Sequence, residues 1–308
     1  CVSAAGVTLV DITCRPSSTC FAMASSVREI PFTVENARGD AVDCDMRFVA
    51  DDDGDKPVVV FCHGFKGFKD WGPYPAWGRH LARSGAVSVH VNFSYNGVHR
   101  DAPTEFTELD KFADNTFTRE LDDLQTVLGA VEERRLPEAP ADPNCIGLLG
   151  HSRGGGTVIL QTARDDRVDA LVTWSSVATF VDRFSDEQIE DWETQGYTEI
   201  RNSRTGQVMR LNKILYDDTM AHREELDVPG AASRIDVPWL VVHARDDEAV
   251  DIGAGETLAS ASDTAELFEA EGGHTFGGAH PFDGTVPASL ETVWDRTTAF
   301  FRTHLNAA

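Results

Sequence analysis

Ser152 lies in a short glycine-rich segment whose pattern is typical of a catalytic nucleophile. Residues 150–155 read Gly-His-Ser-Arg-Gly-Gly, and they directly follow an apolar run at residues 145–149 that predicts a strand. In a G-x-S-x-G turn between a strand and a helix, the serine has strained backbone dihedrals and the flanking glycines avoid the clashes of a Cβ. The serine oxygen then lies at the carboxyl edge of the sheet, beside a helix N-terminus that stabilises negative charge. We therefore predict that Ser152 is a nucleophile.

A histidine and a group of carboxylates follow later in the chain, in the order that such a serine requires. A serine hydroxyl attacks only when a neighbouring base takes its proton, and the base needs a carboxylate to hold its tautomer. His274 follows the predicted strand 265–268, in a loop that also contains glycines. The loop after the predicted strand 239–243 offers three carboxylates, Asp246, Asp247 and Glu248. We predict that His274 is the base and that one of these carboxylates orients it.

The tripeptide His63-Gly64-Phe65 directly follows the apolar run at residues 57–62. A carbonyl oxygen that gains negative charge needs two backbone N–H groups close by, and a loop in this position supplies one of them. We expect that donor to be Phe65, and the second to be Arg153, the residue after the nucleophile. His63 lies at the strand end before the donor, so we expect its ring only to support the loop.

Aromatic residues crowd the loop that follows this tripeptide. Local packing explains such a cluster, and the alternative is that some of the rings line a substrate pocket. Our candidates for substrate binding are Phe68, Trp71 and Tyr74. Arg153 and Arg204 are placed to meet either a substrate carboxylate or only water.

Strand and helix signals alternate from residue 27 onward. Strands are predicted at residues 27–32, 41–48, 57–62, 87–93, 145–149, 170–174, 239–243 and 265–268. Helices are predicted at residues 75–84, 118–135, 155–163, 255–261 and 287–304. This alternation predicts an α/β fold in which helices flank a mostly parallel sheet that opens with an antiparallel hairpin.

One interval breaks the alternation, because about sixty residues separate the predicted strands 170–174 and 239–243. A structureless loop of that length is improbable in a compact domain. The interval contains two helical stretches, at 186–194 and around 217–225, and a hairpin turn at 203–206. We therefore predict a cap at residues 177–237, inserted into a core formed by residues 23–176 and 238–308.

The chain is strongly acidic, with 51 Asp and Glu against 27 Lys and Arg and a formal net charge of -24. Such a surface repels nucleic acid and anionic membranes, so we expect neither as a partner. No stretch approaches the roughly 18 apolar residues of a membrane span. The charge also fits a source with high internal salt, and an ordinary acidic protein is the alternative.

Six cysteines show neither paired C-x-x-C spacing nor the density of a disulfide-stapled secreted domain. We therefore expect a cytoplasmic protein. The alternatives are a small loop closed by Cys14 and Cys20, and a lipid-modified chain that begins at Cys1. Met23 is a plausible start, which would make residues 1–22 a dispensable N-terminal extension.

At these motifs the sequence resembles a bacterial branch of the α/β-hydrolase family. The resemblance runs from about residue 27 to residue 305. Members of this branch are similar to cinnamoyl and feruloyl esterases and to dienelactone-hydrolase-like proteins, and others are acylaminoacyl-peptidase-like proteins. The motifs that carry it are residues 63–71, 150–156, 202–207, 274–276 and 280–282.

The resemblance implies an α/β-hydrolase fold and hydrolysis of carboxylic esters. It assigns catalysis to Ser152, Asp247 and His274, with the oxyanion donors Phe65 and Arg153. Its pattern places the acid four residues after His243, which selects Asp247 over its neighbours.

From the residues and the resemblance together we expect a serine carboxylesterase that forms an acyl-enzyme, with a small-molecule ester as its substrate. Hydroxycinnamate esters are among the candidates. No metal or organic cofactor is implied by these residue types. The first alternative is a serine aminopeptidase or acylaminoacyl-peptidase-like hydrolase, and the second is a catalytically silent binding protein on the same fold.

Overall fold

The computed structural model describes residues 26–50 and 54–305. The predicted extension at residues 1–22, Met23 and part of the acidic loop lie outside the described residues. Among the described helices, none is long and apolar enough to cross a lipid bilayer.

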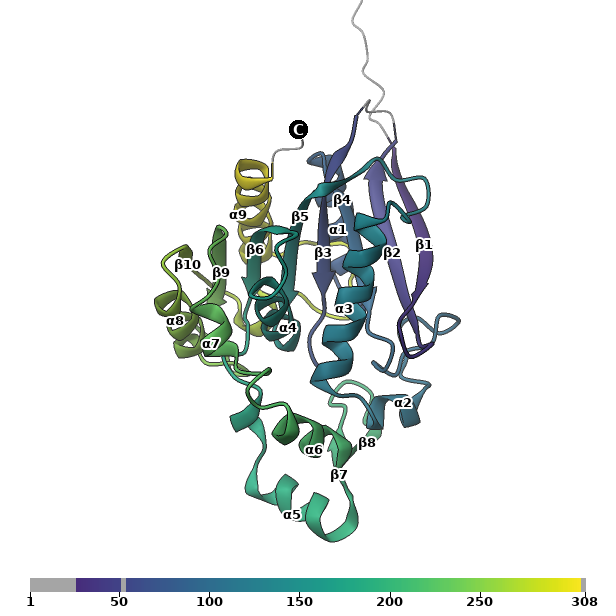
Figure 1. Cartoon of the computed structure of the whole chain (residues 1–308), viewed down its shortest axis with the longest axis vertical. Coiled ribbons are helices and arrows are strands. Elements are labelled where there is room, and N and C mark those ends of the chain that lie inside the picture. Colours follow the sequence, from purple (N-terminus) through teal and green to yellow (C-terminus); the bar gives the residue numbers. More distant parts are fainter. Residues whose placement is uncertain (1–25, 51–53, 306–308) are drawn as a thin grey trace, which may run out of the picture.

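Eight of the described strands form one sheet in the order β1-β2-β4-β3-β5-β6-β9-β10 (Figure 1). The strands β1 and β2 form an antiparallel hairpin, β2 is antiparallel to β4, and the other neighbours are parallel. This confirms the predicted mostly parallel sheet that opens with a hairpin. Their bounds are β1 (Val27–Glu35), β2 (Ala41–Val49), β3 (Lys56–Cys62), β4 (Val87–Asn92), β5 (Ala141–His151), β6 (Val168–Trp174), β9 (Trp239–Ala244) and β10 (Ala265–Ala270).

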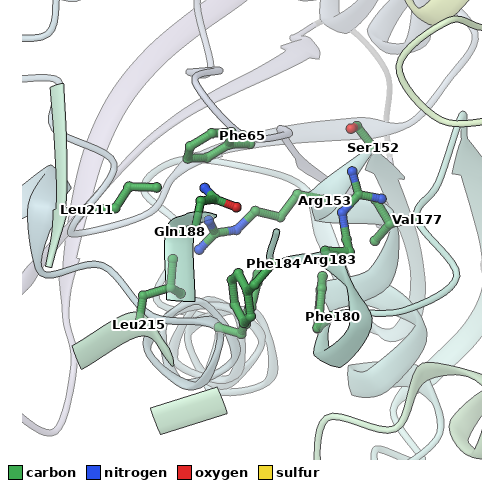
Figure 2. Close-up of a pocket in the computed structure, with 11 residues that line it drawn as sticks. Phe65, Ser152, Arg153, Val177, Phe180, Arg183, Phe184, Gln188, Leu211 and Leu215 are labelled. Carbon is green, nitrogen blue, oxygen red and sulfur yellow. The ribbon is translucent and has the colours of Figure 1, made fainter. Parts of the chain in front are cut away.

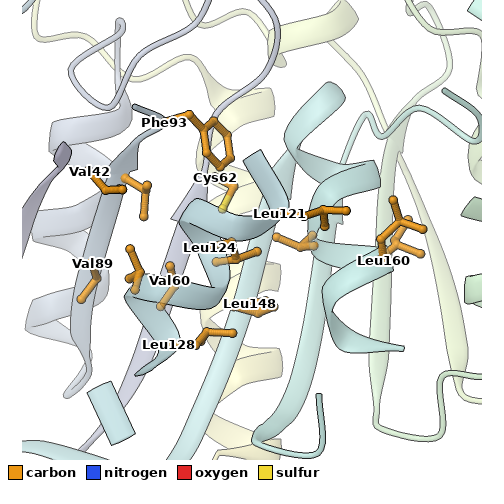
Figure 3. Close-up of a cluster of buried hydrophobic side chains, with 14 of the residues drawn as sticks. Val42, Val60, Cys62, Val89, Phe93, Leu121, Leu124, Leu128, Leu148 and Leu160 are labelled. Atoms are coloured by element: carbon orange, nitrogen blue, oxygen red, sulfur yellow. The ribbon is translucent and has the colours of Figure 1, made fainter. Parts of the chain in front are cut away.

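Helices cover both faces of the sheet, because the central strands are apolar on both sides. Along β3, Val58 and Val60 point into the hydrophobic cluster that includes α3, whereas Val59 and Phe61 point into the cluster that includes α1 and α9. Figure 3 shows leucines of α3 packed over valines of the sheet. The helices on the α3 face are α3 (Phe117–Glu132), α4 (Arg153–Thr162) and α8 (Ile252–Ala261), and those on the opposite face are α1 (Tyr74–Arg83) and α9 (Ala288–His304).

The segment between β6 and β9, here called the cap segment, adds a two-stranded antiparallel sheet and several helices. Figure 1 shows α5, α6, β7 and β8 beyond the end of the main sheet, on the side of its carboxyl strand ends. One helix here, α7, instead packs against α4 and α8 of the core. The elements are η1 (Val181–Arg183), α5 (Asp186–Gln195), β7 (Tyr197–Arg201), β8 (Val208–Asn212), α6 (Ile214–Ala221) and α7 (Val228–Ala232).

The cap segment has a small hydrophobic centre of its own. Trp192 of α5 is buried, and its indole N–H donates to the carbonyl oxygen of Leu211 on β8 at 2.8 Å. The rings of Phe184 and Tyr216 lie within 5.6 Å of the Trp192 ring, measured between ring centroids. This cluster ties α5, β8 and α6 into one unit.

Polar contacts attach this unit to the core. The Asn212 side-chain amide donates to the Asp114 carboxylate at 2.7 Å, just after the short helix α2 (Leu109–Ala113). The Thr118 hydroxyl, at the start of α3, donates to the Asp218 carboxylate of α6. The cap segment is therefore held over the sheet edge where Ser152 lies.

Candidate active site

Ser152 occupies a sharp turn between β5 and α4. Its backbone has φ 55° and ψ -117°, a left-handed conformation that non-glycine residues rarely adopt. Its amide donates to the Trp174 carbonyl oxygen at 2.8 Å, which fixes the turn against β6. The turn needs its glycines, since a Cβ on Gly150 would lie 2.2 Å from the Gly154 oxygen, and a Cβ on Gly154 would lie 2.4 Å from the Cys62 oxygen.

His274 and Asp247 form a close pair in the loops that follow β10 and β9. The His274 Nδ1–H donates to Asp247 Oδ2 at 2.8 Å. The other carboxylate oxygen of Asp247 accepts the amides of Ala249 and Val250, both at 2.9 Å. Burial alone would raise the pKa of Asp247, but these hydrogen bonds outweigh it and lower that pKa to about 2. Asp247 is therefore ionised at neutral pH and holds His274 with its Nε2 free to accept a proton.

The two neighbouring carboxylates have different surroundings. The Oδ1 of Asp246 accepts the backbone amides of Gly272 and Gly273 at 3.1 and 3.0 Å, whereas the His274 ring donates to Asp247. Asp246 therefore fixes the backbone just before His274, which the sequence did not suggest. Glu248 is exposed to solvent.

His243, at the end of β9, is a second histidine beside the acid. Its Nε2–H donates to the Val250 carbonyl oxygen at 2.8 Å and lies 3.6 Å from Asp247 Oδ2. Burial lowers the pKa of His243, which keeps the ring neutral. Because His243 is neutral, the negative charge of Asp247 is available to stabilise a protonated His274.

His151, the residue before Ser152, connects the turn to the His274 loop. Its Nε2 lies 2.9 Å from the His274 carbonyl oxygen, which can only accept, so Nε2 carries the proton. Its Nδ1 then accepts the Tyr74 hydroxyl at 3.0 Å. Burial lowers the pKa of His151 to about 3, so this ring also stays neutral. This contact could not be predicted from the sequence, because the position after the first glycine of the motif accepts many residue types.

The loop after β3 lies directly against the serine turn. A Cβ on Gly64 would be 2.9 Å from the Ser152 Cβ, so only glycine permits this approach. The His63 Nδ1–H donates to the Gly64 carbonyl oxygen at 2.9 Å, and Asn96 lies 3.3 Å from the other ring nitrogen. The backbone N–H of Arg153 is in the first turn of α4, where no intrahelical acceptor exists. The two expected donor loops are thus brought together around Ser152.

Two cavities meet at Ser152. The first, of about 190 Å³, is mostly apolar and lies between the core and the cap segment; Figure 2 shows its lining, with Ser152 at one side. The second, of about 410 Å³, is more polar and lies on the His274 side. Apolar residues of the first include Phe65, Phe117, Phe180, Phe184, Leu211 and Leu215. The second is lined in part by Lys66, Trp71, Tyr74, His151, Arg204 and His274.

Of the three aromatic candidates for substrate binding, the structure brings Trp71 and Tyr74 to the second cavity. Phe68 is fully buried, packs edge-on against Phe106 and His280, and lines neither cavity. Its ring therefore supports the loop from behind, and the prediction of a direct substrate contact is not supported for it.

The Arg153 side chain is already paired within the protein. Its Nη2 lies 2.9 Å from Glu120 Oε1 on α3, its Nε donates to Oε2 at 3.1 Å, and the guanidinium lies 4.4 Å from the centre of the Phe117 ring. Both partners are buried, so this cation is neutralised and is not available to a substrate carboxylate.

Within the described ranges, no group of three or more His, Cys, Asp and Glu side chains is placed to hold a metal ion.

No family model matches the sequence, and no curated protein matches it either. Solved structures do match. Est1E from Butyrivibrio proteoclasticus with ferulic acid bound is 20% identical to this chain in sequence, with a TM-score of 0.66. The match covers 89% of this chain and 98% of the Est1E chain. The esterase domain of a Rhodothermus marinus protein has 16% identity and a TM-score of 0.59, covering 91% and 100%.

A third match, the acylaminoacyl peptidase of Pyrococcus horikoshii, has 18% identity and a TM-score of 0.62, and covers 92% of this chain but 42% of its own. Identities this low establish the architecture and leave activity to the site itself. Together with the strand order and the serine turn between β5 and α4, these matches show that the chain has the α/β-hydrolase fold.

Proposed function

We propose that the protein is a serine hydrolase that cleaves a small carboxylic ester through an acyl-enzyme on Ser152. The observation that carries the proposal is the juxtaposition of a serine held at φ 55° and a histidine bonded to a buried carboxylate at 2.8 Å. Ser152 and His274 also line the same cavity. A nucleophile, a base and a carboxylate that orients the base are the parts that acyl transfer requires.

The first half of the proposed reaction forms the acyl-enzyme. The Ser152 Oγ attacks the ester carbonyl carbon while the Nε2 of His274 takes the hydroxyl proton. Asp247 balances the resulting imidazolium, and the amides of Phe65 and Arg153 donate to the carbonyl oxygen as it becomes negative. The tetrahedral intermediate then expels the alcohol, which receives the proton from His274.

The second half returns the enzyme to its starting state. A water molecule gives a proton to His274 and attacks the acyl carbon, and the Ser152 oxygen leaves and regains its proton. The acid product is released.

The two cavities can be assigned to the two halves of an ester. Because His274 must protonate the leaving oxygen, the alcohol belongs on the side of the cavity that His274 lines, which is the second. The acyl group then occupies the first cavity, whose phenylalanines and leucines favour an apolar or aromatic chain. Est1E was solved with ferulic acid, so hydroxycinnamate esters belong among the substrates to be tested.

An aminopeptidase function is less well supported by the site. An enzyme that reads the free amino group of a substrate usually offers it a carboxylate, and no Asp or Glu from the described residues lines either cavity. A silent binding protein is disfavoured by the complete set of catalytic groups.

The experiment is a comparison of kcat/KM for p-nitrophenyl butanoate, methyl ferulate and an aminoacyl anilide. We expect turnover of at least one ester, and a loss of about three decades or more in Ser152→Ala. Ser233→Ala, which changes an exposed serine beyond α7, is the matched control and should behave as wild type. Cleavage of the anilide alone would favour the peptidase, and ester turnover that survives Ser152→Ala would contradict the mechanism.

A further inference from the structure

The cavities beside Ser152 have the opposite charge to the rest of the protein. The chain carries 51 acidic and 27 basic residues, yet the described residues that line the two cavities include no Asp or Glu. Cations do line them, with Lys66 and Arg204 in the second cavity and Arg153 and Arg183 in the first. Arg153 is already paired with Glu120, so Lys66, Arg183 and Arg204 are the cations that give this region the charge needed to bind an anion.

Lys66 and Arg204 differ from most cations in the described part of the chain, because no described carboxylate pairs with them. Arg210, on the same hairpin as Arg204, pairs with Glu199 at 3.4 Å. Neither Lys66 nor Arg204 forms an ion pair with any residue in the described part of the chain. Lys66 is half-buried, with its Nζ 5.8 Å from the centre of the Phe65 ring. Their charges are therefore not neutralised by any carboxylate of the described residues.

The turn that carries Arg204 is held in place on the core. The buried side chain of Asn202 accepts the Arg204 amide at 3.1 Å, which fixes the start of the turn. The Gln207 side-chain amide donates to the Phe106 carbonyl oxygen at 3.1 Å. The Arg204 Nη2 lies 3.5 Å from the carbonyl oxygen of Thr104, so the guanidinium points back toward the core. Arg204 is thus positioned at the cavity despite its exposure.

His280 does not take over this positive charge. Its Nδ1 accepts the Gly72 amide at 2.8 Å, and its ring stacks on Trp71 with 6.0 Å between ring centroids. Burial, and secondly the nearby Arg204, lower the pKa of His280, so the ring is neutral at pH 7. Lys66, in the loop after β3, and Arg204, in the turn between β7 and β8, are therefore the two cations of the second cavity that can bind an anion.

We propose that the leaving alcohol of the substrate carries a carboxylate, which Arg204 and Lys66 bind in the second cavity. The inference rests on the proposed ester hydrolysis, because His274 assigns the alcohol to this cavity. A planar guanidinium binds a carboxylate through two parallel hydrogen bonds, and a lysine adds a third donor. The carboxylate remains unchanged in the reaction and serves to orient the leaving oxygen toward His274.

The test uses two butanoate esters that differ only in charge, those of 3-hydroxybenzoate and of 3-hydroxybenzamide. We expect the wild type to prefer the carboxylate ester by about tenfold or more in kcat/KM. Arg204→Gln should bring this ratio close to one, and Lys66→Gln should lower it by a smaller factor. Salt should also reduce the ratio, because screening weakens an attraction at an open cavity.

Two further arginines serve as controls. Arg201→Gln removes an exposed arginine of β7 that has no ion pair with the described residues and lines neither cavity, so the ratio should be unchanged. Arg183→Gln removes the arginine of the first cavity that forms no ion pair with a described residue, and the ratio should again be retained.

The outcomes separate this inference from the proposed function. If neither ester is hydrolysed faster than by Ser152→Ala, the proposed function fails. If both are hydrolysed and the wild type does not prefer the carboxylate ester, the function stands and the anion site is wrong. A preference that Arg183→Gln abolishes and Arg204→Gln preserves would also overturn the inference, because the carboxylate would then be bound in the first cavity.

Discussion

The imidazole of His151 donates a hydrogen bond to the backbone carbonyl oxygen of His274 over 2.9 Å. His151 directly precedes Ser152, so this bond joins the serine turn to the loop of the base. Because the bond holds the His274 backbone, it fixes the distance between the base and Ser152. A small error in that distance would slow proton transfer. The Tyr74 hydroxyl completes the connection by donating to the other nitrogen of His151.

Tyr74→Phe should weaken this connection without removing a catalytic group. The change leaves the buried Nδ1 of His151 without a donor, which costs about 1–3 kcal/mol of unfolding free energy. We expect a lower urea midpoint and a reduced kcat. Tyr197→Phe in the cap segment is the control and should change neither, since the Tyr197 hydroxyl bonds to no described residue. Equal midpoints for the two variants would show that the bond to His151 contributes nothing.

The triad acid can be identified by three substitutions. Asp247→Asn should lower kcat by up to about 10⁴, because the imidazole loses the partner that fixes its tautomer and supports its charge. Asp246→Asn should stay within about tenfold of wild type, since its side-chain oxygen can still accept the Gly272 and Gly273 amides. Glu248→Gln, at an exposed position, should match the wild type.

Asp246→Ala completes this series, because alanine cannot accept the two amides. We expect it to lose more activity than Asp246→Asn and less than Asp247→Asn. The assignment of Asp247 is wrong if Asp246→Asn is the crippled variant and Asp247→Asn is near wild type.

Much of this site could be predicted from the sequence, because its main parts are local. The glycines around Ser152 are required by a turn only a few residues long, and the loops of Asp247 and His274 each follow a continuous apolar strand. The strands β3, β5 and β9 could be predicted from their continuous apolar runs. Such runs are typical of strands that are covered on both faces of the sheet.

Other features depend on contacts between distant segments and left no local pattern. The pairing of Arg153 with Glu120 joins α4 to α3, and the burial of Phe68 depends on Phe106 and His280. The loop around Phe68 has no periodic pattern, so the sequence does not reveal which rings face inward. The short helix α2 was missed because five residues are too few for a helical period.

Buried neutral histidines should make stability depend on pH. Burial lowers the pKa of His63 to about 4, whereas an unfolded histidine has a pKa near 6.5. Between these values the unfolded chain binds more protons than the folded one, so stability falls as the pH drops through this window. For His63 alone we expect a loss of about 2 kcal/mol between pH 7 and pH 5.

Urea unfolding at the two pH values measures this effect. His63→Gln should show a smaller pH difference than wild type, because glutamine does not titrate. His99→Gln, at an exposed histidine, should retain the wild-type difference. An unchanged pH difference in His63→Gln would mean that His63 is not held neutral by burial.

Added salt should stabilise the protein. A formal net charge of -24 implies repulsion among surface carboxylates, and molar KCl reduces it by screening. We expect Tm to rise with KCl by more than it does in sucrose of equal osmolality, which controls for exclusion of solutes from the surface. A melting temperature that does not respond to KCl would indicate an ordinary acidic protein.

The most direct test of the central claim is to label the protein with a fluorophosphonate and locate the adduct by mass spectrometry. If Ser152 is the nucleophile activated by His274, the wild type should gain a single adduct, on the peptide that contains Ser152, and lose its esterase activity in proportion. Ser152→Ala should gain none, and His274→Gln should react far more slowly. An adduct on another serine, or full activity in a protein that is fully labelled at Ser152, would contradict the account.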